Sequence, residues 1–225
     1  MRKWAEKYPV IPFAAPFAAF IALLGLQSTL GLSLSWEYPL RVVVVSAVLA
    51  LFSLPLISQR PRYAIQSVLV GLAVFVIWVG PDIAWPSYRS HWLFQNGLMG
   101  TVRSSIPAGT RSDLVFLGFR LFGTAIVVPM IEELFWRGWL MRYIIHSEFQ
   151  KVPFGKYAPL SFWLTAIFFA SEHGPFWEVG LLAGIIYNGW MIRTRNLSDC
   201  ILAHAVTNAC LGAYVLVFGK WQYWL

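Results

Sequence analysis

Long apolar runs separated by short polar segments follow one another along most of this chain. A helix needs roughly 20 mainly apolar residues to cross the hydrocarbon core of a bilayer. The pattern therefore predicts an all-α, polytopic transmembrane helical bundle with about seven spans, in a range of six to eight. The candidate spans are Val10–Leu34, Leu40–Ile57, Ala64–Val79, Leu114–Ile145, Ala158–Glu172, Val179–Met191 and Cys200–Phe218.

Three of these runs have features of their own. Leu114–Ile145 is too long for one perpendicular helix, so we expect it to bend at Pro129 or to extend into the interface. Ala158–Glu172 and Val179–Met191 are short, and the His173-Gly174-Pro175 turn joins them. This arrangement predicts a tight helical hairpin that does not fully cross the membrane.

The composition favours a membrane protein over a soluble one. Of the 225 residues, 58% are hydrophobic and 12% are charged. A soluble domain of this size has no interior large enough to bury so much apolar surface. The 12 Trp and nine Tyr residues suit the membrane–water interface. With no internal repeat or polar tract, residues 1–225 are interpreted as a single integral membrane domain.

The net charge of +7 does not indicate nucleic-acid binding, because the basic residues form short clusters between apolar runs. If the N-terminus is cytoplasmic, ten of the basic residues lie in segments on the cytoplasmic side (inside) and five in segments on the other side (outside). Cytoplasmic segments of membrane proteins carry the excess of Lys and Arg, so this distribution predicts a cytoplasmic N-terminus. The inside set is Arg2, Lys3, Lys7, Arg60, Arg62, Arg142, Lys151, Lys156, Arg193 and Arg195. The outside set is Arg41, Arg89, Arg103, Arg111 and Lys220. The outside loop between residues 81 and 113 is also rich in aromatic residues, which suggests a segment lying on the membrane surface.

Ionisable side chains inside apolar runs need a reason, since a charge at the centre of a membrane helix costs about 2.5–3.5 kcal/mol on insertion scales. In the fourth run, Glu133 and Arg137 lie four residues apart on one helical face and can form an ion pair. Glu132 projects about 100° away. Its carboxylate therefore lacks this partner, which makes it a candidate general base. The alternative is that both glutamates are solvated at the cytoplasmic interface.

Further polar side chains occur in the second half of the chain. His173 follows Phe169 by four residues and, taken alone, is more often a polar helix end than a catalytic group. His204 and Asn208 share one face of the last run. Both donate hydrogen bonds, so they can hold a developing oxyanion; the alternative is interhelical hydrogen bonding. Arg120, about 9 Å into the fourth run, is expected to snorkel to the outer interface, with a salt bridge to a cavity acid as the alternative.

The order and spacing of these clusters resemble the CAAX protease and bacteriocin-processing family of intramembrane peptidases. The family signature is Glu-Glu-x-x-x-Arg, then Phe-x-x-x-His, then His-x-x-x-Asn or Asp, on successive helices. All three motifs occur here, as Glu132-Glu133…Arg137, Phe169…His173 and His204…Asn208. The resemblance covers a motif-bearing core at residues 114–218. The size of the chain suggests the bacterial CAAX protease-related branch, some of whose members accompany exosortase-type sorting systems.

The resemblance implies an intramembrane endopeptidase whose conical cavity opens to the membrane. Glu132 and His173 would activate a water, and His204 and Asn208 would bind the tetrahedral oxyanion. The supporting residues would be Glu133 and Arg137 as an ion pair, and Phe169 as packing for the helix end. The expected substrate is a membrane-inserted or lipid-anchored peptide, although no feature of the sequence indicates a prenyl-binding groove. The expected location is the bacterial inner (plasma) membrane.

Zinc is the alternative to a metal-free reaction. Glu132, His173 and His204 provide one carboxylate and two imidazoles, which can hold a catalytic zinc with an open fourth position. Against zinc, the sequence has no His-Glu-x-x-His helix, and Asn208 is a poor zinc ligand. We therefore expect a metal-free, glutamate-dependent hydrolysis.

Two functions outside hydrolysis fit the same pattern. The chain can be a non-catalytic membrane scaffold or immunity-type protein that keeps the motif residues for packing. It can also be a small transporter that uses Glu132 and the histidines as a proton or ion relay. No inverted repeat of the kind found in transporters is visible.

Overall fold

The computed structural model describes residues 7–57 and 60–224, which fold into helices and contain no strand. This confirms the predicted all-α bundle. The long helices outside the fourth run are α2 (Ile11–Leu30), α3 (Leu34–Phe52), α5 (Ala64–Ala84), α9 (Pro159–Ser171), α10 (Trp177–Thr194) and α11 (Leu197–Phe218). Short helices in the connections are α4 (Leu54–Ile57), η1 (Tyr88–Ser90), η2 (Ala108–Ser112), η5 (Phe149–Lys151), η6 (Gly174–Phe176) and η7 (Trp221–Tyr223).

The fourth predicted run is a continuous helix with two widened turns. Its parts are α6 (Leu114–Phe122), the π-helical η3 (Gly123–Val127), α7 (Val128–Glu133), the π-helical η4 (Leu134–Leu140) and α8 (Met141–Tyr143). Pro129 lies in the first turn of α7 and has no N–H to donate to the preceding turn. The helix therefore continues past the proline by widening, and π-helical turns of this kind are frequent at functional sites.

Each of the seven predicted apolar runs corresponds to a helical stretch. Among the described residues, four of these stretches are long and apolar enough to cross a membrane: Leu34–Phe52, Ala64–Ala84, Leu114–Tyr143 and Leu197–Phe218. Ile11–Gln27 and Pro159–Ser171 are shorter apolar helices. An expectation of about seven spans is compatible with this arrangement, and the protein is an integral membrane protein.

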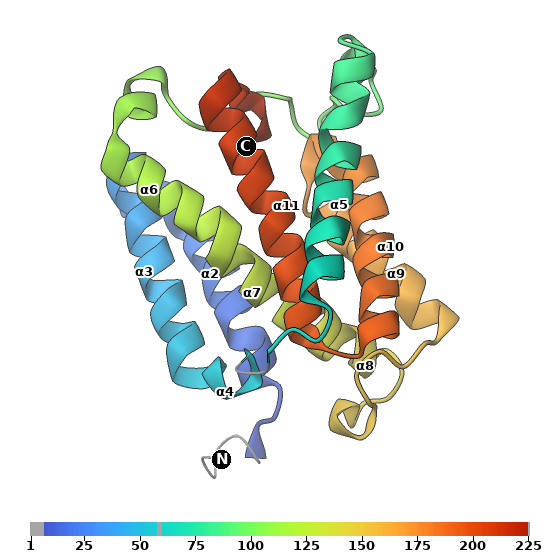
Figure 1. The fold of residues 1–225 in the computed structure, drawn as a ribbon. Coiled ribbons are helices and arrows are strands. Elements are labelled where there is room, and N and C mark those ends of the chain that lie inside the picture. Colours follow the sequence, from blue (N-terminus) through green and yellow to red (C-terminus); the bar gives the residue numbers. More distant parts are fainter. Residues whose placement is uncertain (1–6, 58–59, 225) are drawn as a thin grey trace.

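Helix α11 occupies the middle of the bundle (Figure 1). It contacts α5 and α10 on one side and α7 with η3 on the other. Helices α2 and α3 pack together on the α6 side, while α9 packs against α10 as the predicted hairpin. The parts of the fourth, fifth and last apolar runs that carry the predicted site residues are thus brought together around α11.

A glycine allows the closest of these contacts. A Cβ added to Gly71 of α5 would overlap the Ala203 carbonyl oxygen and the Val206 side chain of α11. The two backbones therefore approach each other as small residues permit in membrane helix pairs. The same approach lets Thr207 Oγ1 donate a hydrogen bond of 2.8 Å to the Gly71 carbonyl.

The loop between α5 and α6 is fixed to the bundle by a buried arginine. Arg89 Nε lies 2.8 Å from Asp82 Oδ1, and Arg89 Nη2 lies 2.7 Å from Glu178 Oε1. Arg89 Nη1 also donates to the Pro175 carbonyl at 2.8 Å. Because Pro175 belongs to the turn after His173, this loop restrains the segment that carries one of the predicted site residues.

The predicted orientation of the chain stays a prediction. Of the basic residues assigned to the outside, Arg41 and Arg89 are buried and form ion pairs with acidic side chains. Arg2 and Lys3, assigned to the inside, lie outside the described residues. The connections nevertheless fall at two opposite ends of the bundle, as an alternating path across a membrane requires (Figure 1).

Asp199 joins the start of α5 to the start of α11, and its loss is expected to destabilise the fold. Its carboxylate accepts hydrogen bonds from Arg62 N at 3.1 Å, Tyr63 N at 2.9 Å and Ser67 Oγ at 3.0 Å. Asp199→Asn removes the charge and one accepting oxygen from a fully buried position. We expect the free energy of unfolding to fall by about 1–3 kcal/mol, measured by thermal unfolding in detergent micelles.

The control for this variant is Glu148→Gln. Glu148 is exposed, and its carboxylate forms an ion pair with the exposed Lys151 at 2.7 Å. An exposed pair contributes little, so the unfolding temperature of this variant should not change measurably. Equal effects of the two substitutions would contradict an anchoring role for Asp199.

Candidate active site

A cavity of about 160 Å³ lies among α5, α6, α7, α10, α11 and the segment after α9. The four predicted catalytic residues, Glu132, His173, His204 and Asn208, all line it. They come from three different parts of the chain, so their meeting is a consequence of helix packing. The structure therefore places these side chains around a single small cavity.

The two adjacent glutamates of α7 have different surroundings, as the helical geometry predicts. Glu133 is fully buried and does not line the cavity. Glu132 lines the cavity, and its Oε2 atom has no hydrogen-bond partner among the described residues. A buried carboxylate oxygen of this kind is available to a water or a substrate group.

The predicted ion pair between Glu133 and Arg137 is present. Arg137 Nη1 donates to Glu133 Oε1 at 3.0 Å, and both side chains are fully buried. Arg137 Nε also donates to Asn188 Oδ1 at 2.9 Å, and Arg137 Nη2 donates to the Gly184 carbonyl at 3.3 Å. Asn188 belongs to α10, and its role as a partner of Arg137 was not predicted from the sequence. The feature that could have indicated it is a polar amide side chain inside the sixth apolar run.

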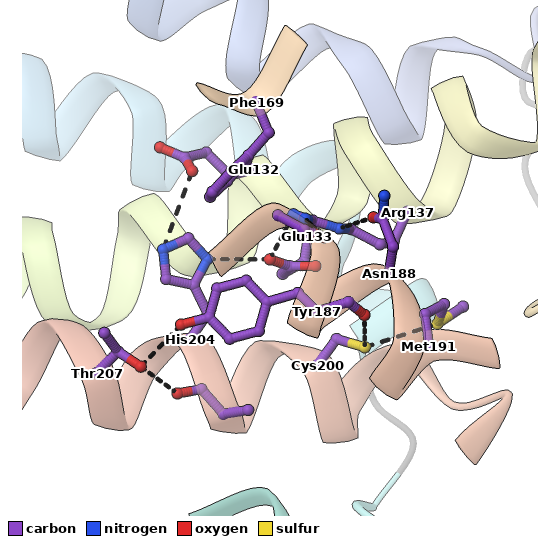
Figure 2. Close-up of polar contacts among 12 residues, drawn as sticks. Glu132, Glu133, Arg137, Phe169, Tyr187, Asn188, Met191, Cys200, His204 and Thr207 are labelled. Carbon is purple, nitrogen blue, oxygen red and sulfur yellow. Dashed lines mark hydrogen bonds and ion pairs between the residues drawn. The ribbon is translucent and has the colours of Figure 1, made fainter. Parts of the chain in front are cut away.

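His204 lies between the two carboxylates (Figure 2). Its Nδ1 atom is 2.9 Å from Glu133 Oε1, the oxygen that also accepts from Arg137. Its Nε2 atom is 4.0 Å from Glu132 Oε2. A carboxylate can only accept here, so Nδ1 carries the proton. Nε2 then faces the cavity acid, and a protonated His204 would present an N–H there.

Two aromatic residues hold the His204 ring in place. The Tyr187 ring stacks on it with centroids 5.1 Å apart and an angle of 25° between the planes. The Tyr187 hydroxyl donates to Thr207 Oγ1 at 2.7 Å. Phe169 is buried with its ring centroid 5.8 Å from that of His204 and 4.8 Å from that of His173. Phe169 thus packs between the two histidines, whereas Tyr187 and Thr207 were missed by the sequence interpretation.

The His173 ring has a defined tautomer. Its Nδ1 atom lies 2.7 Å from the Phe169 carbonyl oxygen, which can only accept. Nδ1 therefore carries the proton, and in the neutral ring Nε2 offers a lone pair. The edge-to-face contact with Trp78, at a centroid distance of 5.1 Å, fixes the ring from the other side.

Asn208 is oriented by the widened turn before α7. The Val128 N–H donates to the Gly123 carbonyl, and Pro129 has no N–H. The Thr124 carbonyl is thereby available to a side chain, and Asn208 Nδ2 donates to it at 2.9 Å. A primary amide has two N–H donors, so a second one remains for a group in the cavity.

Arg120 also lines the cavity, which differs from the expected snorkelling to the interface. Its guanidinium carbon lies 4.7 Å from the centroid of the Tyr38 ring and 5.7 Å from that of the Trp224 ring. The tertiary packing of α3 and of the segment after α11 provides these aromatic faces. No spacing within the sequence signals them.

The residues considered for zinc do not form a ligand set in this arrangement. No group of three or more His, Cys, Asp or Glu side chains in residues 7–57 and 60–224 is placed to hold a metal ion. His204 Nδ1 is engaged by Glu133 Oε1 at 2.9 Å, so only Nε2 of this ring faces Glu132, at 4.0 Å from Oε2. The arrangement can instead supply two acceptors, the Glu132 carboxylate and His173 Nε2. Its two donors are the free amide N–H of Asn208 and the Nε2–H of a protonated His204.

A comparison with protein families gives a match for part of the chain. Residues 114–210 match the model of a family described as type II CAAX prenyl endopeptidase Rce1-like. The matched segment contains Glu132, His173, His204 and Asn208. No curated protein and no solved structure matches the chain.

Proposed function

We propose that the chain, whose residues 114–210 match the model of the Rce1-like family of type II CAAX prenyl endopeptidases, is an intramembrane endopeptidase with a glutamate-activated water. The substrate is a membrane-inserted or lipid-anchored peptide. The observation that carries this proposal is the Glu132 carboxylate, which lines a cavity and whose Oε2 atom has no hydrogen-bond partner among the described residues. The two histidines and Asn208 line the same cavity.

The attacking water is bound between Glu132 and His173. Glu132 accepts a proton from the water as the oxygen attacks the peptide carbonyl. His173 Nε2 accepts the second hydrogen bond of the water, since Nδ1 of this ring donates to the Phe169 carbonyl. The proton held by Glu132 then passes to the leaving amine, which gives one carboxylic acid and one amine.

The negative charge on the former carbonyl oxygen is stabilised by His204 and Asn208. Asn208 contributes the amide N–H that does not bond Thr124. His204, held by Glu133 through Nδ1, contributes an Nε2–H when its ring is protonated. Preorganised donors of this kind typically contribute about 10²–10³ in rate.

Cleavage of reconstituted peptides tests the proposal. The purified protein is placed in liposomes with single-span peptides, with and without a lipid anchor, and the products are identified by mass spectrometry. We expect two fragments whose masses sum to that of the peptide plus one water. A scaffold would leave every peptide intact. A transporter would also leave the peptides intact and would show ion-dependent flux in the same liposomes.

Chelation tests the metal-free form of the mechanism. We expect 1,10-phenanthroline to leave the cleavage rate unchanged, because the described histidines and acids form no metal-binding group. The measurement is the initial rate before and after chelation, with the zinc content of the purified protein determined in parallel. Loss of activity that is restored by added zinc would overturn this part of the proposal.

A further inference from the structure

The position of His173 depends on the turn that follows it. Gly174 has a φ of 48°, in the left-handed region that favours glycine, and it begins the short helix η6 (Gly174–Phe176). The Phe176 N–H donates to the His173 carbonyl at 2.9 Å, and the His173 N–H donates to the Ala170 carbonyl at 3.1 Å. The backbone of His173 is therefore fixed between the end of α9 and this turn, so a displaced turn would carry the imidazole with it.

Arg89 contacts three positions of the chain directly after His173. Its Nη1 atom donates to the Pro175 carbonyl at 2.8 Å, and its guanidinium carbon lies 4.0 Å from the centroid of the Phe176 ring. Its Nη2 atom lies 2.7 Å from Glu178 Oε1, in the first turn of α10. One planar guanidinium thus holds the turn through its edge and through its face, which the single ammonium group of a lysine does not reproduce.

The contact of Arg89 with Phe176 continues to the His173 ring. The Trp78 ring of α5 stacks with the Phe176 ring at a centroid distance of 6.4 Å and an angle of 21°. The same Trp78 ring meets the His173 ring edge-to-face at 5.1 Å. From α10, a Cβ added to Gly180 would lie 3.0 Å from His173 Nδ1, so the imidazole is closely packed there as well. A shift of the Phe176 ring would therefore be passed to the imidazole through Trp78.

The charge of Arg89 is balanced away from the cavity. Its Nε atom lies 2.8 Å from Asp82 Oδ1, and Asp82 Oδ2 accepts a hydrogen bond of 2.7 Å from the Tyr223 hydroxyl. Arg89 is buried, is not one of the described residues that line the cavity, and lies outside the segment that matches the family model. A buried ion pair often contributes little net stability, because desolvation offsets the attraction. The effect of Arg89 on the reaction is therefore expected through the geometry of the turn.

We propose that Arg89 is a positioning residue, which keeps His173 Nε2 where it can share one water with Glu132. It acts through the Pro175 carbonyl and the Phe176 ring and does not touch the substrate. This inference rests on the proposed peptidase function. It adds to that function a residue of the loop between α5 and α6, outside the motif-bearing helices.

A comparison of Glu178→Gln with the double variant Glu178→Gln, Arg89→Gln tests the proposal. Glu178→Gln removes one charge of the ion-pair network and leaves the hydrogen bond from Arg89 to the Pro175 carbonyl in place. The double variant then removes the guanidinium without leaving the Glu178 carboxylate unpaired, so it should fold more readily than Arg89→Gln alone. If the double variant does not fold, Arg89→Lys, which keeps the charge, decides by the same measurements.

We expect the kcat of the double variant to fall by about 10- to 100-fold relative to Glu178→Gln, because a catalytic group misplaced by about 1 Å can cost this much. KM should stay within about twofold, since Arg89 does not touch the substrate. Both constants are measured with the peptides in liposomes, at a temperature at which both variants remain folded. A loss of stability alone would not separate kcat from KM in this way.

The His173 ring is observed directly by NMR of protein with ¹³C-labelled histidine in detergent micelles. Its Cε1–H signal is assigned by its absence from the spectrum of His173→Gln, and it responds to the ring currents of the aromatic neighbours. We expect this signal to shift or broaden in the double variant and to stay in place in Glu178→Gln.

Arg111→Gln is the control for both measurements. Arg111 belongs to the same loop, stacks on Trp221 and donates to the Ile106 carbonyl at 3.2 Å, so its loss should change neither the His173 signal nor kcat. An unchanged His173 signal in the folded double variant would overturn the inference, and so would an unchanged kcat or a loss that falls on KM alone. Failure of the proposed peptidase function gives a different result, because the wild-type protein would then cleave no peptide while the His173 signal of the double variant would still shift.

Discussion

Glu132→Gln is expected to lower the rate of peptide hydrolysis by about 10²–10⁴-fold and to leave the fold intact. The amide has the size of the acid but cannot accept the proton of the attacking water. Glu132 makes no part of the ion pair with Arg137, and Oε2 has no hydrogen-bond partner among the described residues. The measurement is the single-turnover rate together with the unfolding temperature in the same detergent.

Glu133→Gln provides the contrast for this prediction. Oε1 of Glu133 accepts from both Arg137 and His204, so its loss should lower stability and activity together. Glu132→Gln should lower activity alone. Full activity of the Glu132→Gln protein would exclude this residue as the base and would favour a role of the cavity outside hydrolysis.

The parts of the site that depend on neighbouring turns of one helix could be predicted from the sequence. The ion pair of Glu133 with Arg137 follows from a spacing of four residues, and the different environment of Glu132 follows from the 100° step of the helix. The seven apolar runs likewise define the helices, because bilayer thickness sets their length. These features need no knowledge of how the helices pack.

The contacts between helices could not be predicted in this way. His204 and Asn208 were interpreted as oxyanion donors, with interhelical hydrogen bonding as the alternative, but the sequence did not indicate that His204 Nδ1 would bond Glu133. The stacking of Tyr187 on His204 and the hydrogen bond from Arg137 to Asn188 depend on how α10 lies against α11 and η4. Rotation of one helix by a fraction of a turn would change each contact while leaving the sequence pattern the same.

In the fourth run, one residue links local helix geometry to a contact between helices. The run was expected to bend at Pro129 or to extend into the interface, and the structure shows π-helical turns on either side of α7. The missing N–H makes the Thr124 carbonyl available, and Asn208 from α11 donates to it. A local property of proline therefore orients a side chain of another helix. The sequence contains the cause, but the partner becomes visible only in the folded protein.

The second large effect is expected from Arg137→Met. This substitution leaves the Glu133 carboxylate fully buried beside His204 without its arginine. Removing one partner of a buried ion pair typically costs about 3–5 kcal/mol. We expect a loss of this size in the free energy of unfolding, measured by denaturation in mixed micelles, and a loss of hydrolysis because Glu133 no longer holds His204 in one position.

A matched arginine in the same long helix separates charge pairing from packing. Arg142 is also buried, but it donates to the carbonyls of Val152 at 2.7 Å and Gly138 at 2.9 Å and not to an acid. Arg142→Met should therefore cost less, because it leaves no buried carboxylate behind. The double variant Glu133→Gln with Arg137→Met should lose less stability than the sum of the two single losses, with a coupling energy of about 0.5–3 kcal/mol. Additive effects of the two substitutions would mean that the pair is not the element that stabilises the site, and that the anchoring of Arg137 by Asn188 and the Gly184 carbonyl is sufficient.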